Sequence, residues 1–337
     1  MLPLIGVTMG DPAGIGPEVV LKAIQSKCGD CRFVVLGDLA VMAETTRQLG
    51  GMLTPVPWQL TEPYPVDPTR LPVLSLSHLS ADQRKLGHPS PAGGAASYTY
   101  VEVAVRLTLN KTLDGLVTAP ISKAMWHAAG HTYPGHTELL AALTHTAEVR
   151  MMLLGSRLRV ILVTTHLALS QVPGALSTGR IFKTITMAAD HLSVFHGLDR
   201  PRLAVAGLNP HAGERGAFGD EEERIIAPAV RQAHTQGIVV DGPLPADTVF
   251  VRAVKGEFDG VVCLYHDQGL IPLKLLSWED GVNVTIGLPI VRTSPDHGTA
   301  FDIAGQGKAD PRSMGAAIAL AVRMAQNRSI NEPNNFS

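Results

Sequence analysis

The stretch DGVVCLYHDQGLIPLK, residues 259–274, decides how the rest of the chain is interpreted. Its apolar run, residues 261–265, is typical of a buried strand and stops abruptly at His266 and Asp267. Lys274 follows within the same stretch. An imidazole, a carboxylate and an ammonium titrate in different pH ranges. Their placement where a strand leaves the core indicates a candidate reaction site.

The same arrangement occurs at two other predicted strand ends. His166 follows the predicted strand in RVILVTTHLAL, and His211 follows the predicted strand in LAVAGLNPHAGE. In open parallel sheets, ligands bind outside the carboxyl ends of the strands, so neighbouring strands would bring these residues and His266 to one rim. Three neutral imidazoles with an open coordination position suit a catalytic divalent metal such as zinc. A single histidine at a strand end is more often structural, so the hypothesis depends on the three strands sharing one sheet.

Short β-branched runs alternate with longer amphipathic stretches along the chain. This alternation predicts an α/β protein with a largely parallel sheet covered on both faces. The predicted strands are residues 4–9, 32–37, 115–119, 159–165, 203–208, 260–265 and 282–287. The predicted helices are residues 17–25, 95–110, 137–144, 179–195, 221–237 and 313–328. The Pro-rich residues 53–91 are predicted to form a surface excursion with a short extra strand at 71–76.

Length and composition favour a globular protein with two α/β lobes. The chain has 337 residues, of which 45% are hydrophobic and 17% are charged. Its net charge of −2 and the lack of a basic block argue against a nucleic-acid backbone as the main partner. Residues 1–16 are predicted to contain a first strand and not a signal peptide, and no apolar run approaches the length of a membrane span. We therefore expect a cytoplasmic protein.

The cysteines are too few for a disulfide framework. Cys28 and Cys31 form a CxxC pair, and Cys263 is the third cysteine. Without a second CxxC or a nearby histidine, the pair is predicted to lie in an ordinary helix-to-strand turn.

A second group of residues is suited to an anionic ligand. YPGHTELLAALT places His136 and Thr137 at the start of an apolar helical run, where Thr137 or a neighbour would cap the helix. The free N–H groups there and the helix dipole favour an anion, although an ordinary capped helix explains the same residues. Lys274 and Arg292 add the cations that a phosphate needs. Because Arg292 follows an apolar run, we expect it to be buried against something anionic.

The glycine-rich GDPAGIGPEVV follows the first predicted strand. It lacks the GxGxxG spacing, so it does not give a dinucleotide-binding fingerprint. A tight strand-to-helix turn explains it as well as any binding role.

These motifs together resemble the 4-hydroxythreonine-4-phosphate dehydrogenase family of vitamin B6 biosynthesis. The resemblance runs in order from about residue 5 to residue 325, through MGDPAGIGPE, TAPISK, YPGHTE, TTHL, GLNPHAGE, GPLPADT, YHDQG, VNVTIGLP and RTSPDHGTAFDIAG. It implies two α/β/α domains with a cleft between them, as in isocitrate and isopropylmalate dehydrogenases. The expected ranges are 1–125 with 275–337 for the first domain. Residues 126–274 would form the second, with most metal ligands and the dimer interface.

The resemblance also implies roles for individual residues. The metal ligands would be His166, His211 and His266, and the substrate contacts would be His136, Thr137, Lys274, Asn283 and Arg292. The cofactor would lie by His297, Gly298 and Thr299. The family acts as a homodimer whose active site is completed by the partner subunit, so the three imidazoles need not come from one chain.

The reaction that the resemblance implies is a metal-dependent, NAD(P)-linked oxidation and decarboxylation of 4-phosphooxy-L-threonine to 3-amino-2-oxopropyl phosphate. Zinc is the expected metal, with magnesium, manganese and cobalt as alternatives, and the choice between NAD and NADP stays open. Lys274 is expected to serve catalysis as well as phosphate binding. Asp247 and Asp267 are expected to relay protons or orient ligands, although either could equally cap backbone N–H groups.

Other functions remain open on the sequence. Relatives in the same family act on 4-phospho-D-threonate or 4-phospho-D-erythronate, and a more distant branch oxidises an aromatic cis-dihydrodiol. The residues do not separate an amino acid substrate from its hydroxy-acid analogue. A metal-dependent phosphatase is less favoured because such enzymes usually use carboxylates that bridge two metals. A protein that only binds its ligand is less favoured still, since it would leave a catalytic type of metal site unused.

Overall fold

The computed structural model describes residues 2–26 and 31–331. The chain divides into two compact units, Met1–Ala147 with Leu288–Gln326 and Glu148–Gly287 with Asn327–Ser337. The observed junctions thus follow Ala147 and Gly287, whereas the expected ranges place them after residues 125 and 274. Cys28 lies outside the described residues, and Cys31 is buried.

The first unit contains parallel strands only. In spatial order they are β3 (Thr54–Pro57), β4 (Arg70–Ser75), β2 (Arg32–Gly37), β1 (Leu4–Thr8), β5 (Gly115–Thr118) and β12 (Arg292–Pro295). Every neighbouring pair among these strands runs parallel. The segments that follow β1 and β5 therefore leave the sheet at the same edge, where the Asp11 N–H donates to the Pro120 carbonyl at 2.9 Å.

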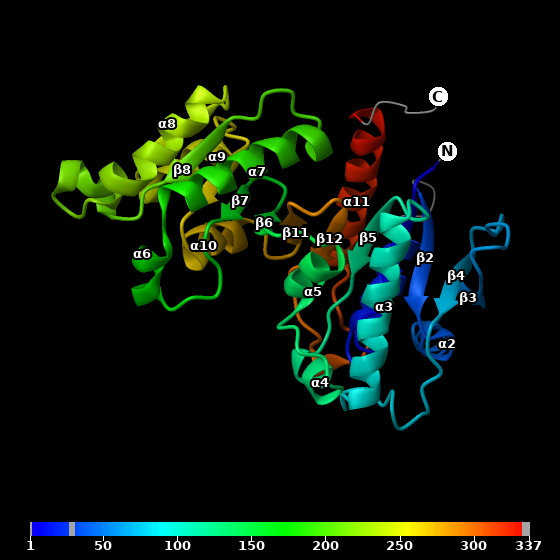
Figure 1. Ribbon diagram of the computed structural model, residues 1–337. Helices are drawn as coiled ribbons and strands as arrows, with labels where there is room; N and C mark the ends of the chain where they lie inside the picture. Colours follow the sequence, from blue (N-terminus) through cyan, green and yellow to red (C-terminus); the bar gives the residue numbers. More distant parts are fainter. Residues whose placement is uncertain (1, 27–30, 332–337) are drawn as a thin grey trace. The chain divides into compact units, whose positions relative to one another are not determined.

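The helices of the first unit are α1 (Gly16–Gln25), α2 (Leu39–Gln48), α3 (Pro91–Leu109), α4 (Lys123–Ala128), α5 (His136–Leu143), η4 (Phe301–Ile303) and α11 (Arg312–Asn331), of which residues 327–331 are assigned to the second unit. Short polar side chains or prolines favour the starts of α1 to α4. The Asp38 carboxylate accepts the N–H groups of Ala40 and Val41 at 2.9 and 3.2 Å and so caps α2. The long α3 packs on β1, β2 and β5, as Figure 1 shows.

The second unit has a mixed sheet. In spatial order its strands are β11 (Val282–Ile286), β6 (Arg150–Leu154), β7 (Arg159–Leu162), β10 (Gly260–Cys263), β8 (Leu203–Ala206) and β9 (Val240–Leu244). β6 is antiparallel to both of its neighbours, and the strands from β7 to β9 are parallel. The three strands that precede the predicted metal ligands, β7, β10 and β8, are therefore neighbours in one sheet. The metal hypothesis required these three strands to share one sheet, and they do.

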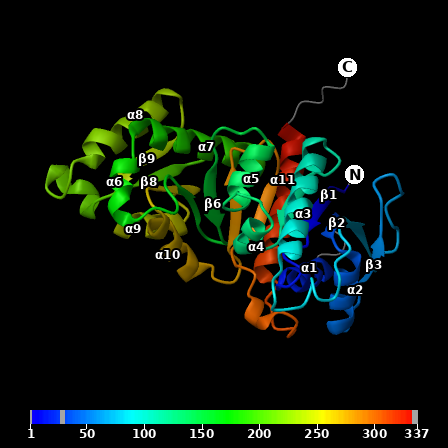
Figure 2. The same ribbon diagram turned by 60° about the horizontal axis from the view of Figure 1, so that its bottom comes forward.

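Helices cover both faces of this sheet. They are η1 (Leu169–Gln171), α6 (Val172–Ala175), α7 (Thr178–His196), η2 (Pro210–Gly216), η3 (Glu222–Ile226), α8 (Ala227–Thr235), α9 (Ala246–Val254) and α10 (His266–Leu276). Leu162 on β7 belongs to the apolar cluster that includes Leu270 and Leu273 of α10, and the preceding Ile161 lies near Leu192 of α7. Alternate residues of a strand point to opposite faces, which agrees with the positions of α7 and α10 in Figures 1 and 2.

The α/β fold class and all seven predicted strands are confirmed, as is the short extra strand, which is β4. The structure adds β3, β6, β9 and β12, and the α-helices α2, α4, α6, α9 and α10. α10 was missed because Gly269 and Pro272 interrupt its helical pattern.

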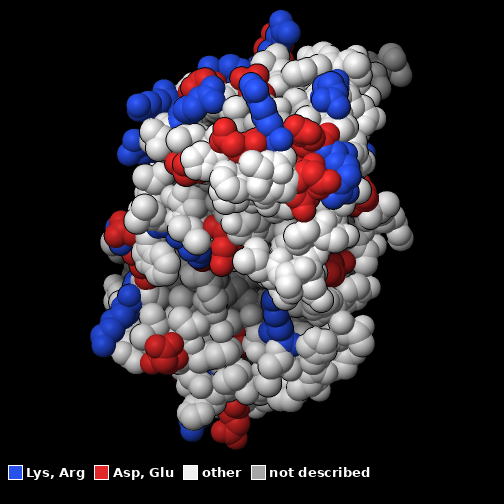
Figure 3. Space-filling model, turned by 90° about the vertical axis from the view of Figure 1, so that its left-hand side faces the viewer, with Lys and Arg blue, Asp and Glu red and all other residues white. Residues whose placement is uncertain are grey.

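The surface agrees with the small net charge. On the face seen in Figure 3, basic and acidic side chains are interspersed, with uncharged surface between them. Within residues 2–26 and 31–331, every helix is too short or too polar to cross a bilayer.

We expect Leu162→Ala to destabilise the second unit. Leu162 is fully buried and lies against Gly269 of α10, so its truncation leaves a cavity and lowers the free energy of unfolding by about 2–5 kcal/mol. Denaturant titration followed by circular dichroism measures the change. Val251→Ala, at a side chain that is 54% exposed, is the control and should stay within about 0.5 kcal/mol of wild type. Equal stability of the two variants would contradict this packing.

Candidate functional site

Two of the predicted metal ligands lie together beyond the carboxyl ends of β7 and β10. The ring centroids of His166 and His266 are 5.6 Å apart. The Nδ1 atom of His266 lies 2.7 Å from Oδ1 of Asp267. A carboxylate accepts hydrogen bonds, so Nδ1 is the donor, and in a neutral ring of this tautomer Nε2 keeps the lone pair that a metal needs. Asp267 is thus hydrogen-bonded to a candidate ligand, and its role in orienting that ligand stays a prediction.

His211 does not join this pair. It lies in η2, where five consecutive residues, 211–215, have left-handed or near-left-handed φ values between 42° and 79°. Its side chain is exposed, its Nδ1 atom is 3.8 Å from Oε2 of Glu214, and its ring lies 6.1 Å from that of Phe218. Among the residues that the structure describes, no group of three His, Cys, Asp or Glu side chains is arranged to hold a metal. The predicted common rim for three imidazoles of one chain is therefore not observed.

The loop that carries His211 is shaped by a residue that the sequence analysis missed. The buried carboxylate of Glu222 accepts the N–H groups of Leu208 and Asn209, both at 2.7 Å, and the Asn209 side-chain amide at 2.9 Å. These bonds fix the backbone just before His211. The acidic run GDEEE in the sequence was the available signal, but acidic runs are usually solvated.

In the first unit, Arg292 is the central cation. It begins β12, is 3% exposed, and donates from Nε and Nη2 to the Thr118 hydroxyl at 3.2 and 2.7 Å. Burial lowers the pKa of its guanidinium to about 9. An anion placed beside it would offset this desolvation. The expectation that Arg292 is buried is confirmed.

His136 and Thr137 are the first two residues of α5. The cap position is Gly135, which has no side chain to bind the first N–H groups of the helix. The Nε2 atom of His136 is buried and has no hydrogen-bond partner among the described residues, and its ring lies 5.6 Å from that of Trp126. Burial, with the nearby charges of Arg292 and Lys123, lowers the pKa of His136 well below its usual value. The imidazole is therefore neutral at pH 7.

Lys123 was not among the predicted substrate contacts. It ends the motif TAPISK and begins α4. A Cβ atom built at Gly135 would lie 3.3 Å from the Cε atom of Lys123. The Lys123 side chain therefore passes close to the start of α5. Arg292, Lys123 and the free helix end together make this part of the first unit suited to an anion.

The predicted cofactor segment contacts the glycine-rich turn. The Thr299 carbonyl accepts the Ile15 N–H at 2.9 Å, and a Cβ atom at Gly14 would meet that carbonyl at 2.8 Å. Gly14 therefore permits a close approach that a larger residue would prevent. The Nδ1 atom of His297 lies 3.1 Å from the Gly298 carbonyl, and its Nε2 atom is buried without a hydrogen-bond partner in the described chain. An unsatisfied buried nitrogen beside a glycine-rich turn fits a polar ligand such as a dinucleotide.

The remaining predicted residues belong to the second unit. Lys274 lies in the last turn of α10, with its Nζ atom 5.4 Å from the centre of the Trp278 ring. Asn283 lies in β11, and its Oδ1 atom is buried without a hydrogen-bond partner among the described residues. Asp247 is exposed in the first turn of α9. The predicted set is thus shared between the units, with anion and cofactor residues in the first and the imidazoles, carboxylates, Lys274 and Asn283 in the second.

Comparison with known proteins gives full-length relatives. A 4-hydroxythreonine-4-phosphate dehydrogenase from Geobacter metallireducens is 49% identical over 331 residues, 96% of each chain. A D-threonate 4-phosphate dehydrogenase from Cupriavidus necator is 46% identical and covers 97% of this chain and 99% of its own length. The crystal structure of 4-hydroxythreonine-4-phosphate dehydrogenase from Klebsiella pneumoniae has a TM-score of 0.87 at 44% identity, over 97% of this chain and 99% of that one.

A more distant structure shares the fold alone. A β-decarboxylating dehydrogenase from Thermococcus kodakarensis has a TM-score of 0.51 at 14% identity, over 98% of this chain and 89% of its own. This likeness agrees with the predicted fold class.

Residues 29–321 match the family described as pyridoxal phosphate biosynthetic protein PdxA. The match covers most of both units, and relatives more than 40% identical align over nearly the whole chain. The chain therefore belongs to the PdxA family.

Proposed function

We propose that this chain oxidises and decarboxylates 4-phosphooxy-L-threonine to 3-amino-2-oxopropyl phosphate, with NAD or NADP and a divalent metal. The observation that carries the proposal is the buried Arg292 guanidinium beside the neutral His136 and the uncapped start of α5. Such a group of donors suits a phosphate. The 49% identity to a 4-hydroxythreonine-4-phosphate dehydrogenase supports the choice of substrate.

Binding of the phosphate would use several donors. Arg292 would give charge-assisted hydrogen bonds, whose strength increases in a buried site. His136, being neutral, would contribute a single N–H donor, and Thr137 would contribute its amide or hydroxyl. Lys274 and Asn283 are proposed as further substrate contacts. The buried, unsatisfied Oδ1 atom of Asn283 supports its part, because it would accept a hydrogen bond from the substrate.

The proposed reaction removes a proton and a hydride from a secondary alcohol β to the carboxylate. The product is a β-keto acid, which then loses CO2. When bound, the metal supplies a positive charge that lowers the pKa of the alcohol, and the dinucleotide accepts the hydride. Asp267 would hold His266 in the tautomer that a metal needs. Asp247 and Asp267 are proposed to receive or relay the released proton, with Lys274 as a further catalytic residue.

The metal is proposed to be zinc, held by His166, His266 and His211 of the partner subunit. The close His166 and His266 rings supply part of the donor set, and the separate position of His211 supports a ligand from a second copy. α10 begins with His266, carries Lys274, and exposes Ile271 and Leu275 on one face. Trp278, just beyond it, is 77% exposed. Large exposed apolar side chains favour an interface, which supports a homodimer.

A second candidate is D-threonate 4-phosphate dehydrogenase. The Cupriavidus necator relative with that name is 46% identical, nearly as similar as the Geobacter metallireducens relative. The two substrates share the phosphate and the oxidised alcohol, and they differ in an amino or hydroxyl group next to the carboxylate. The residues that support phosphate binding therefore support both candidates.

Arg292→Ala should reduce kcat/KM for the phosphorylated substrate by the equivalent of about 2–5 kcal/mol, the scale for breaking a buried charge pair. The loss should be much smaller for the dephosphorylated analogue, because it has no phosphate to lose. Steady-state kinetics of both substrates measure this. Arg312→Ala, at an exposed arginine paired with Asp310, is the matched control and should be close to wild type. Equal losses for both substrates would remove the phosphate role.

Mixing inactive variants tests the shared metal site. His211→Ala and His266→Ala should each lose bound metal and activity as pure proteins. In mixed dimers, one subunit supplies intact His166 and His266 and the other supplies intact His211, so one site should recover. Elemental analysis and activity after co-refolding measure the recovery.

The control mixture combines His166→Ala with His266→Ala, which lie in the same chain's half of the site and should not complement. His234→Ala should keep its metal, since the Nε2 atom of His234 is bound to the Val240 carbonyl. Recovery in the control mixture, or none in the test mixture, would refute this division of ligands.

A direct comparison of 4-phosphooxy-L-threonine and 4-phospho-D-threonate tests the substrate. A charged ammonium and a neutral hydroxyl differ strongly in desolvation cost, so kcat/KM should differ by orders of magnitude in favour of the amino acid. NADH formation and CO2 release are measured together at one metal concentration. A preference for the hydroxy acid would assign the second candidate, and NADH without CO2 would exclude decarboxylation.

A further inference from the structure

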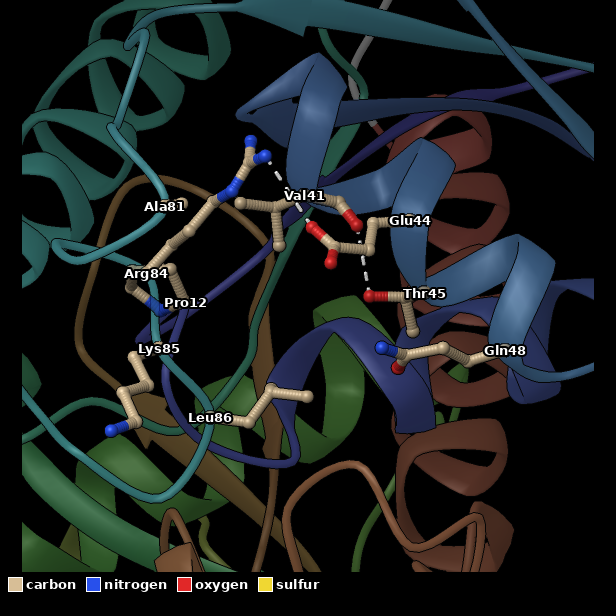
Figure 4. A pocket seen from close by; sticks show the side chains of 9 residues that line it. All are labelled: Pro12, Val41, Glu44, Thr45, Gln48, Ala81, Arg84, Lys85 and Leu86. Carbon is tan, nitrogen blue, oxygen red and sulfur yellow. Dashed lines mark hydrogen bonds and ion pairs between the residues drawn. The ribbon is translucent and has the colours of Figure 1, made fainter.

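The first unit contains a cavity that none of the predicted site residues lines. It lies between α2 and the segment 81–86, and its volume is about 300 Å³. This is within the range of sites for small ligands. Figure 4 shows its lining residues, which are Pro12, Val41, Glu44, Thr45, Gln48, Ala81, Arg84, Lys85 and Leu86. Four of these residues are apolar and five are polar or charged, a mixed lining that suits a flat heterocycle carrying a polar ribose.

The polar side of the cavity contains an ion pair. The Nη2 atom of Arg84 lies 3.4 Å from Oε2 of Glu44, and both side chains are partly exposed. In Figure 4 the Arg84 guanidinium extends toward Glu44, whereas the Lys85 side chain points away from both. A carboxylate and a guanidinium are thus available at one place, and each partly neutralises the other.

The cavity continues toward the predicted cofactor segment. A smaller cavity of about 110 Å³ shares Thr45, Gln48 and Leu86 with it and is also lined by Gly14 and by residues 305–307. Gly14 lies against the Thr299 carbonyl. The two cavities share part of their lining, and together they extend from Gly14, which lies against Thr299, to the Glu44–Arg84 pair, all within the first unit.

We propose that these cavities take the adenosine end of the nicotinamide dinucleotide and that the Glu44–Arg84 pair makes the site select NAD over NADP. This rests on the proposed function, which requires a dinucleotide. A carboxylate accepts a hydrogen bond from the ribose 2′-hydroxyl of NAD, whereas an arginine accommodates the 2′-phosphate of NADP. While Arg84 is paired with Glu44, the negative charge of Glu44 repels a 2′-phosphate. The phosphate must displace the Glu44 carboxylate before it can bind Arg84. NAD meets no such repulsion.

Direct binding separates this proposal from catalysis. NADH and NADPH are titrated against the full-length protein, and the nicotinamide fluorescence gives each Kd without turnover. Wild type should bind NADH about tenfold more tightly than NADPH or better. Glu44→Gln should tighten NADPH binding by about tenfold, because Arg84 is then released to form a charge-assisted hydrogen bond with the 2′-phosphate. Adding Arg84→Ala to that variant should cancel the effect.

Two further variants complete the design. Lys85→Ala removes a neighbouring positive charge that points away from the pair, and its ratio of NADPH to NADH affinity should change less than about twofold. Ala81→Trp puts a bulky side chain at an exposed lining position and should weaken both dinucleotides. Circular dichroism checks that each variant is folded.

Each result bears on one proposal or the other. Unchanged affinities in Ala81→Trp, or an unchanged NADH to NADPH ratio in Glu44→Gln, would overturn the inference while leaving the dehydrogenase proposal intact. Failure of wild type to bind either dinucleotide would instead defeat the proposed function, and this inference with it.

Discussion

The parallel pairing of β7, β10 and β8 places three chain segments at one edge of the second unit's sheet, because the three strands run in the same direction. Their registers set Val261 opposite Val160 and Ala204, so the strands end almost level. The interior of these strands is fully buried and apolar, which leaves no room for polar chemistry before the strand ends. Polar residues can therefore appear only in the segments that follow, and His166 and His266 appear there.

The first unit uses the same parallel arrangement for a different purpose. Thr118 ends β5 and Arg292 begins β12, and the hydrogen bonds between their side chains join two neighbouring strands at a buried position. Burial of a cation is costly, and an anion bound beside Arg292 would offset that cost. One unit thus concentrates positive charge and a neutral imidazole, and the other gathers imidazoles and carboxylates.

Much of this could be predicted from the sequence, and the omissions have identifiable causes. β-branched runs such as GVVCLY and RVILVTT predicted strands correctly, because buried parallel strands need them. β6, with the sequence RMMLL, consists mostly of good helix formers, and β9 contains a glycine and a proline, so neither pattern indicates a strand. Burial of Arg292 was predicted from the apolar run before it. The position of His211 was not predictable, because it depends on a run of left-handed residues and on the distant carboxylate of Glu222.

The way in which Glu222 holds that loop has a consequence for how the family can diversify. Its carboxylate accepts the main-chain N–H groups of Leu208 and Asn209, and every residue except proline supplies such a group at position 208. These bonds therefore hold the backbone before position 211 without using the His211 side chain. Evolution can exchange the residue at position 211, and with it the donor atom offered there, while the backbone that presents it stays in place. Position 222 is more constrained, since a shorter side chain would release both main-chain N–H groups.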